Sequence, residues 1–203
     1  MKAQIKFQKI LTLITLIIAA LTFVFAICFF SGNLADLLRY KRINLQKTTA
    51  NKYDGADDFL YFAQDFISIL VVLAIIFICI CAFLYLTDTH KRRKYYVTNY
   101  VAIGLVIAIT LVTAVFCVIY LSLALAEFQA IDWASWKKDA YDKVAALGYP
   151  SVSQETTMFV IGYVTSGIVL ATGVVWVLNL VWKVKLMKGE KALLEAGLVR
   201  EVA

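Results

Sequence analysis

The sequence has little of the residues that support solution chemistry or a flexible architecture. It holds one histidine, His90, and one proline, Pro150, among 203 residues. A single histidine excludes histidine-based metal clusters and paired histidine relays. A Ser/His/Asp triad would have to use His90 as its histidine. No low-complexity stretch is present, which excludes a flexible linker. We therefore expect a single domain over residues 1–203.

Cysteine is scarce, and its positions exclude a disulfide framework. The four cysteines, Cys28, Cys79, Cys81 and Cys117, all fall in apolar stretches. Cys79 and Cys81 are two residues apart, which places them on different sides of a helix and not in a redox CxxC pair. We expect these side chains to act as small apolar packing residues.

Charge is absent from four long stretches of the chain. Residues 10–30, 66–86, 101–126 and 158–182 contain no Asp, Glu, Lys or Arg, over runs of 21 to 26 residues. A hydrocarbon core of about 30 Å needs about 20 helical residues, and the polar-apolar alternation of membrane barrel strands is missing. The sequence therefore predicts an all-α integral membrane four-helix bundle. The N-terminal run is longer than the apolar part of a signal peptide, so we expect it to be retained.

The distribution of Lys and Arg predicts the orientation of the four spans. Twelve of these residues fall in the N-terminus, the loop 87–100 and the tail 183–203, against eight in the loops 31–65 and 127–157. The positive-inside rule then makes 87–100 and 183–203 the inner loop and inner tail. We expect both termini in the cytoplasm, and the plasma membrane as the location.

A short amphipathic helix is predicted in the second outer loop. Trp133, Trp136 and Tyr141 fall near one side of a helix that closes at Gly148, while lysines occupy the other side. Tryptophan rings favour the headgroup level of a membrane. The segment is either an anchoring interfacial helix or a docking surface for an outside partner.

Two charged clusters in the loops are candidates for ligand contact. Lys91, Arg92, Arg93 and Lys94 form a compact basic run that is suited to anionic lipid headgroups, or that only determines topology. A second cluster, Asp54, Asp57 and Asp58, precedes the second span. We interpret these acids as the solvated start of a helix, because the spacing of a calcium loop is missing.

Within the spans, the polar side chains are mainly hydroxyls, which can bond back to a carbonyl one turn earlier. With no Asp, Glu or His in the charge-free runs, we expect no ionisable group at depth and no proton relay. The fourth span carries two pairs of small residues four apart, Gly162 with Ser166 and Gly167 with Ala171. Such pairs allow close helix approach, within the chain or against a partner.

The topology resembles that of tetraspan families, but the outer cysteines of tetraspanins, claudins and connexins are missing. The expected function is that of a non-catalytic structural or accessory subunit of a membrane complex. One alternative is a homo-oligomeric pore with a hydroxyl-lined conduit, and a weaker one is a membrane-surface enzyme acting on a lipid-like substrate. We expect no catalytic residues, metal or cofactor. The expected partners are membrane lipids and other membrane proteins or further copies, with no nucleic acid.

Overall fold

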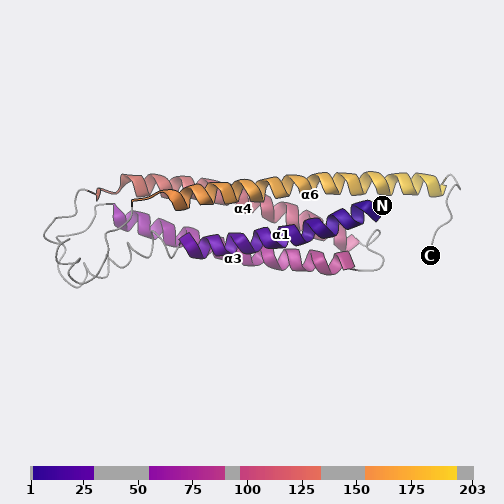
Figure 1. The fold of residues 1–203 in the computed structure, drawn as a ribbon, viewed down its shortest axis with the longest axis horizontal. Helices are drawn as coiled ribbons and strands as arrows, with labels where there is room; N and C mark the ends of the chain where they lie inside the picture. Colours follow the sequence, from indigo (N-terminus) through magenta and orange to yellow (C-terminus); the bar gives the residue numbers. More distant parts are fainter. Residues whose placement is uncertain (1, 30–54, 90–96, 134–153, 196–203) are drawn as a thin grey trace. The chain divides into compact units, whose positions relative to one another are not determined.

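The computed structural model describes residues 2–29, 55–89, 97–133 and 154–195, which are almost entirely helical (Figure 1). This part of the chain holds four helices: α1, Lys2–Phe29; α3, Ala56–Thr89; α4, Val97–Ala130; and α6, Thr157–Glu195. Each contains a stretch that is long and apolar enough to cross a membrane. The predicted all-helical fold with four such helices is confirmed, and it indicates a multi-pass membrane protein.

The helices are longer than the charge-free runs that predict them. Helix α6 has 39 residues, and at 1.5 Å per residue it is roughly 58 Å long, about twice the thickness of a hydrocarbon core. Helix α1 includes Lys6 and Lys9, α3 reaches Asp88, and α6 continues past Lys183. A charge-free run marks only the residues suited to hydrocarbon. A helix continues as long as its backbone hydrogen bonds do.

Helix α3 begins with the acidic turn that the sequence predicts. Gly55, at a φ of 81°, precedes the helix, and Phe59 N donates to Gly55 O over 3.3 Å. Asp57 and Asp58 lie in the first turn, where negative charge stabilises the exposed backbone N–H groups. Asp54 lies outside the described residues.

The chain forms two compact units. Unit 1 contains Met1–Ala20, Ala74–Ala114 and Gly167–Ala203, and unit 2 contains Leu21–Leu73 and Val115–Ser166. Every one of the four helices contributes one segment to each unit. The interiors of the two units differ in their chemistry.

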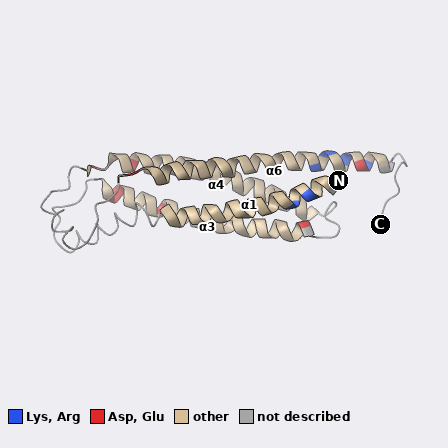
Figure 2. Ribbon diagram, viewed as in Figure 1, with Lys and Arg blue, Asp and Glu red and all other residues tan. Residues whose placement is uncertain are grey.

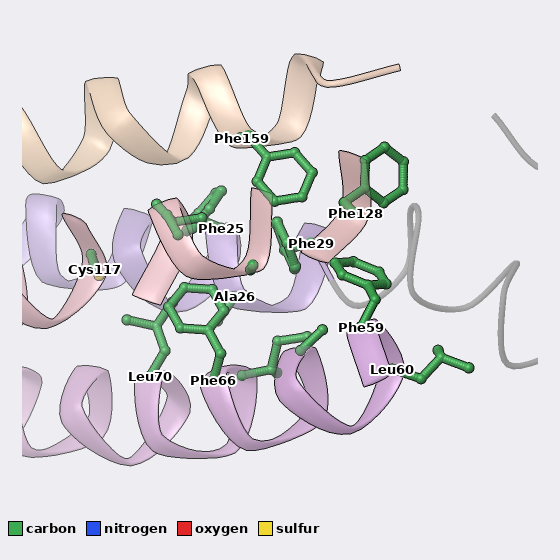
Figure 3. Packing of buried hydrophobic residues seen from close by; sticks show 14 of the residues in the cluster. Phe25, Ala26, Phe29, Phe59, Leu60, Phe66, Leu70, Cys117, Phe128 and Phe159 are labelled. Atoms are coloured by element: carbon green, nitrogen blue, oxygen red, sulfur yellow. The ribbon is translucent and has the colours of Figure 1, made fainter. Parts of the chain in front are cut away.

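The core of unit 2 is aromatic. Phe29 of α1 makes edge contacts with three other rings, those of Phe25, Phe66 and Phe159, at centroid distances of 5.3 to 5.9 Å. Figure 3 shows these rings pointing toward one another from α1, α3 and α6. Phe128 of α4 completes the group through its contact with Phe159 at 5.4 Å. Edge-to-face contacts between rings stabilise a core beyond the contribution of burying such large side chains. Because its rings come from all four helical segments of unit 2, this cluster holds those segments together.

The core of unit 1 has fewer large apolar side chains. Its apolar cluster consists of Leu11, Leu84, Ala102, Ile103, Val106 and Trp176. Polar side chains, most of them hydroxyls and amides, are buried in the same unit. The interior of unit 1 is therefore a mixed one, which sets it apart from the aromatic interior of unit 2.

The outward-facing side chains of the helices are mostly Ile, Leu and Val. Ile17 of α1 and Val72 of α3 are typical, and Leu178 of α6 is 63% exposed. Lys and Arg among the described residues occur only in the first part of α1 and the last part of α6 (Figure 2). Such a surface is suited to lipid or to other apolar helices.

Candidate functional site

A cluster of buried polar side chains lies inside unit 1. We call it the polar cluster, and none of its members is more than 5% exposed. All four helices supply members. They are Gln4, Gln8 and Thr12 from α1, Thr87 and Asp88 from α3, Asn99 from α4, and Asn179 and Lys183 from α6.

Helical spacing explains how these residues reach one interior. Gln4, Gln8 and Thr12 are four residues apart on α1, so their side chains lie on one face of the helix. Asn179 and Lys183 have the same spacing on α6. On the other two helices, the members lie near the end of α3 and at the start of α4. The polar cluster thus brings the first residues of the chain together with residues more than 170 positions later.

The carboxylate of Asp88 is enclosed by donors from two other helices. Thr12 Oγ1 donates to Asp88 Oδ2 over 2.7 Å, and Asn99 Nδ2 donates to Asp88 Oδ1 over 2.8 Å. Gln8 Nε2 also donates to Asp88 Oδ1. Hydrogen bonds to a charged acceptor are stronger than neutral ones, and they replace the water that this carboxylate, 1% exposed, has lost.

The amide of Asn99 uses all four of its hydrogen-bonding positions. Its Nδ2 donates to Thr87 Oγ1 over 2.9 Å and to Asp88 Oδ1. Its Oδ1 accepts from Gln8 Nε2 over 3.0 Å and from Lys183 Nζ. A side-chain amide offers two donor hydrogens and two acceptor lone pairs, so Asn99 is saturated. This one residue links α4 to the three other helices.

Lys183 brings a positive charge into the same interior. Its side chain is 3% exposed, and its Nζ lies 4.4 Å from the centroid of the Tyr100 ring as well as bonding to Asn99. An aromatic face attracts a cation, especially where water is excluded. Asp88 and Lys183 therefore share Asn99 as a common partner. Their opposite charges offset each other within one hydrogen-bonded group, which lowers the cost of burying either.

The outer members of the polar cluster are less completely paired. Gln4 Nε2 donates to Gln8 Oε1 over 3.0 Å and to Asn179 Oδ1 over 3.1 Å. Within the part of the chain that the structure describes, Gln4 Oε1 and Asn179 Nδ2 have no hydrogen-bond partner. The network is thus complete around Asp88 and Asn99 and incomplete around Asn179.

Several buried hydroxyls in both units bond back to a carbonyl one turn earlier, as the sequence predicts, whereas Thr113 Oγ1 has no partner in the described residues. Thr15 Oγ1 donates to Leu11 O over 2.7 Å, and Ser166 Oγ donates to Gly162 O over 2.8 Å. Thr15 also accepts a hydrogen bond from the indole Nε1 of Trp176 at 2.8 Å. The back-bonding expectation is confirmed for these side chains, which therefore require no external ligand.

Two ionisable side chains, Asp88 and Lys183, are buried inside unit 1, although the sequence pattern predicts neither as an interior residue. Asp88 and Lys183 stand just outside the charge-free runs 66–86 and 158–182, so the sequence pattern assigns Asp88 to the inner loop and Lys183 to the inner tail. In the structure both are helical and buried. Their burial depends on partners from other helices, which a pattern within one segment does not show. The available signal was the four-residue spacing of Gln4, Gln8 and Thr12 beside the expected first span.

The polar cluster has the chemistry of a network of hydrogen bonds between helices. Its members are amides, hydroxyls, one carboxylate and one ammonium group, and most of their polar atoms bond to one another. Among the described residues, no group of three or more His, Cys, Asp or Glu side chains is placed to hold a metal ion. In a membrane, hydrogen bonds between helices hold a bundle together where the hydrophobic effect does not.

The aromatic residues predicted at the second outer loop are described only in part. The Trp133 ring packs edge-on against Phe128 at 5.1 Å, and Trp133 N donates to Ile131 O over 3.0 Å. Trp133 therefore adds to the core of unit 2. Trp136, Tyr141 and the predicted interfacial helix lie outside the described residues, as do the basic residues Lys91, Arg92, Arg93 and Lys94.

The two small-residue pairs of α6 have different surroundings. A Cβ added at Gly162 would lie 2.6 Å from Leu121 Cδ1 and 2.7 Å from Phe25 Cζ, and Ser166 is buried. A Cβ added at Gly167 would meet nothing within 4 Å among the described residues, and Ala171 is exposed. The first pair thus packs inside unit 2. The second faces outward from α6.

No family model, curated protein or solved structure matches this chain. Its candidate sites are therefore assigned from their own contacts. The polar cluster of unit 1 is the most extensively connected of them.

Proposed function

We propose that this chain is a non-catalytic multi-pass membrane protein that acts as a structural or accessory subunit of a membrane complex. The observation that carries the proposal is the saturation of Asn99, which places Asp88 and Lys183 in one hydrogen-bonded network. A transport or catalytic site needs polar atoms that are open to a substrate. The central atoms of this cluster are instead occupied by one another, which suits a role in holding helices in register.

The outward faces supply the surface for assembly. Gly167 and Ala171 are four residues apart and exposed, and no side chain covers Gly167 in the described residues. A strip of small residues lets the backbone of a second helix approach closely, where dispersion and Cα–H contacts accumulate. We propose this face of α6 as the contact for a partner subunit. The plasma membrane and cytoplasmic termini remain part of the proposal, on the distribution of Lys and Arg.

The test is purification of the full chain into nanodiscs from cells that express it at native level. The mass of the particle and the identity and stoichiometry of co-purifying chains are then measured. We expect a fixed ratio of this chain to at least one different membrane protein. A clean monomer would contradict the proposal. A closed ring of identical copies would favour the pore alternative.

A pair of variants tests the proposed face. Gly167→Leu combined with Ala171→Leu fills the outward strip, and we expect it to remove the partner while the chain remains folded. Ile168→Phe is the matched control, because it enlarges an exposed side chain on the flank of the same helix. Equal loss of the partner in both variants would show that the strip is not the specific contact.

A further inference from the structure

An aromatic pair connects the beginning of the chain to the end of the last apolar run. The rings of Phe7 on α1 and Trp182 on α6 lie with centroids 5.9 Å apart, and both side chains are 40% exposed. Both residues belong to unit 1. Half-exposed rings of this kind are enriched at the level where hydrocarbon gives way to headgroups.

The residues on either side of the ring pair follow the layers of a membrane. One turn deeper along each helix, Ile10 of α1 and Leu178 of α6 are exposed and apolar. Toward the outer end, Lys6 precedes Phe7 and Lys185 lies three residues beyond Trp182, and both are exposed. On these two antiparallel helices an exposed apolar side chain, an aromatic ring and an exposed lysine thus succeed one another in the same order, while Lys9, between Phe7 and Ile10, lies on the opposite side of α1 from the ring.

The charge at this end of unit 1 is predominantly positive. Figure 2 shows Lys and Arg gathered in the first part of α1 and the last part of α6. Lys183, on the inward side, is already engaged with Asn99 and the Tyr100 ring. Lys6 and Lys185 instead project outward, where a charge of opposite sign would complement them.

We propose that Lys6, Phe7, Trp182 and Lys185 form a binding site for the headgroup of an anionic phospholipid. The two lysines attract the phosphate and any further anionic group, the ring pair lies at the glycerol level, and the acyl chains run along Ile10 and Leu178. A lipid fits better than a soluble anion because the apolar part of the surface continues directly from the basic part. The four residues of this site do not include the basic run Lys91–Lys94, and the proposal goes beyond the proposed subunit role.

Native mass spectrometry of the full chain in detergent measures the binding directly. The protein is titrated with phosphatidylserine and, separately, with phosphatidylcholine of the same acyl chains. We expect phosphatidylserine to bind more tightly, and Lys6→Gln with Lys185→Gln to weaken its first binding step about thirty-fold, as two lysines near the surface imply. Free inorganic phosphate, added as a third arm, should not compete at millimolar concentration.

The matched control is Lys9→Gln with Lys191→Gln. It removes the same charge from the same two helices, but Lys9 is two residues from Phe7 and Lys191 nine from Trp182, which places each on the opposite side of its helix from the ring. Circular dichroism and size-exclusion chromatography establish that both variants are folded. Equal weakening by both pairs, no effect of the Lys6/Lys185 pair, or equal binding of the two lipids would each overturn the proposal. Phe7→Leu with Trp182→Leu should weaken phosphatidylserine binding while keeping both lysines.

Discussion

Asn99 Nδ2 and Asp88 Oδ1 are 2.8 Å apart, in a hydrogen bond that joins the start of α4 to the end of α3. The same amide accepts a bond from Lys183 Nζ, so an acid and a base from different helices meet on one neutral residue. Removing the amide would leave both charges buried with fewer partners.

Asn99→Leu should destabilise the protein strongly. The substitution removes four hydrogen bonds and leaves polar atoms of Gln8, Thr87, Asp88 and Lys183 short of partners, and a broken buried charge network costs about 3–5 kcal/mol. Asn179→Leu is the comparison, because it removes one bond from an amide whose Nδ2 lacks a partner in the described residues. We expect it to cost about 1 kcal/mol. Unfolding in mixed micelles measures both. Equal costs would mean that saturation of Asn99 does not matter.

Asp88 and Lys183 should be energetically coupled. Asp88→Asn and Lys183→Gln each remove one of two opposite charges that share Asn99, whereas the double variant removes both. We expect the double variant to lose less unfolding free energy than the two single variants lose in sum. The difference should be about 1–3 kcal/mol. Asp65→Asn, at an exposed acid on α3, is the control and should change stability little. Simple additivity in the cycle would show that Asn99 does not couple the two charges.

Gly162→Ala and Gly167→Ala should have opposite effects, although the residues lie five positions apart on α6. A Cβ at Gly162 enters a space already held by Leu121 and Phe25, and overpacking typically costs about 1–3 kcal/mol. Leu121 and Phe25 are themselves buried, which limits how far they can move. At Gly167 the added methyl meets no atom of the described residues within 4 Å, so helix propensity should stabilise the chain by up to about 1 kcal/mol. Thermal unfolding of both variants in the same detergent decides the comparison.

Phe29→Ala should weaken unit 2. The ring contacts Phe25, Phe66 and Phe159 and is 1% exposed, and truncation of such a phenylalanine costs about 3–5 kcal/mol. Phe83→Ala is the matched control, since that ring is 39% exposed. Hydrogen exchange, read separately for the segments of unit 2, measures where protection is lost. A similar loss from Phe83→Ala would contradict a special role for the aromatic core.

The four helices could be predicted from the sequence, but the polar interior of unit 1 could not. Freedom from charge is a property of one segment, so the runs 66–86 and 158–182 are visible without a structure. The burial of Asp88 and Lys183 is a property of four segments together. Charge patterning predicts that both residues are exposed to solvent, because it contains no information on the contacts that Asn99 makes with them. For the same reason the two small pairs of α6 look alike in sequence, although among the described residues a Cβ at Gly162 would meet neighbours and a Cβ at Gly167 would meet none.

The order of the helices along the chain gives the polar cluster a place in biosynthesis. Gln8, Thr12 and Asp88 are made before Asn99, and Lys183 is supplied by α6, the last in chain order of the four helices that the structure describes. A nascent chain that has inserted only α1, α3 and α4 therefore contains Asp88 and Asn99 before Lys183 has been translated. Insertion of α6 then adds the opposite charge of Lys183 to the polar cluster through its hydrogen bond to Asn99.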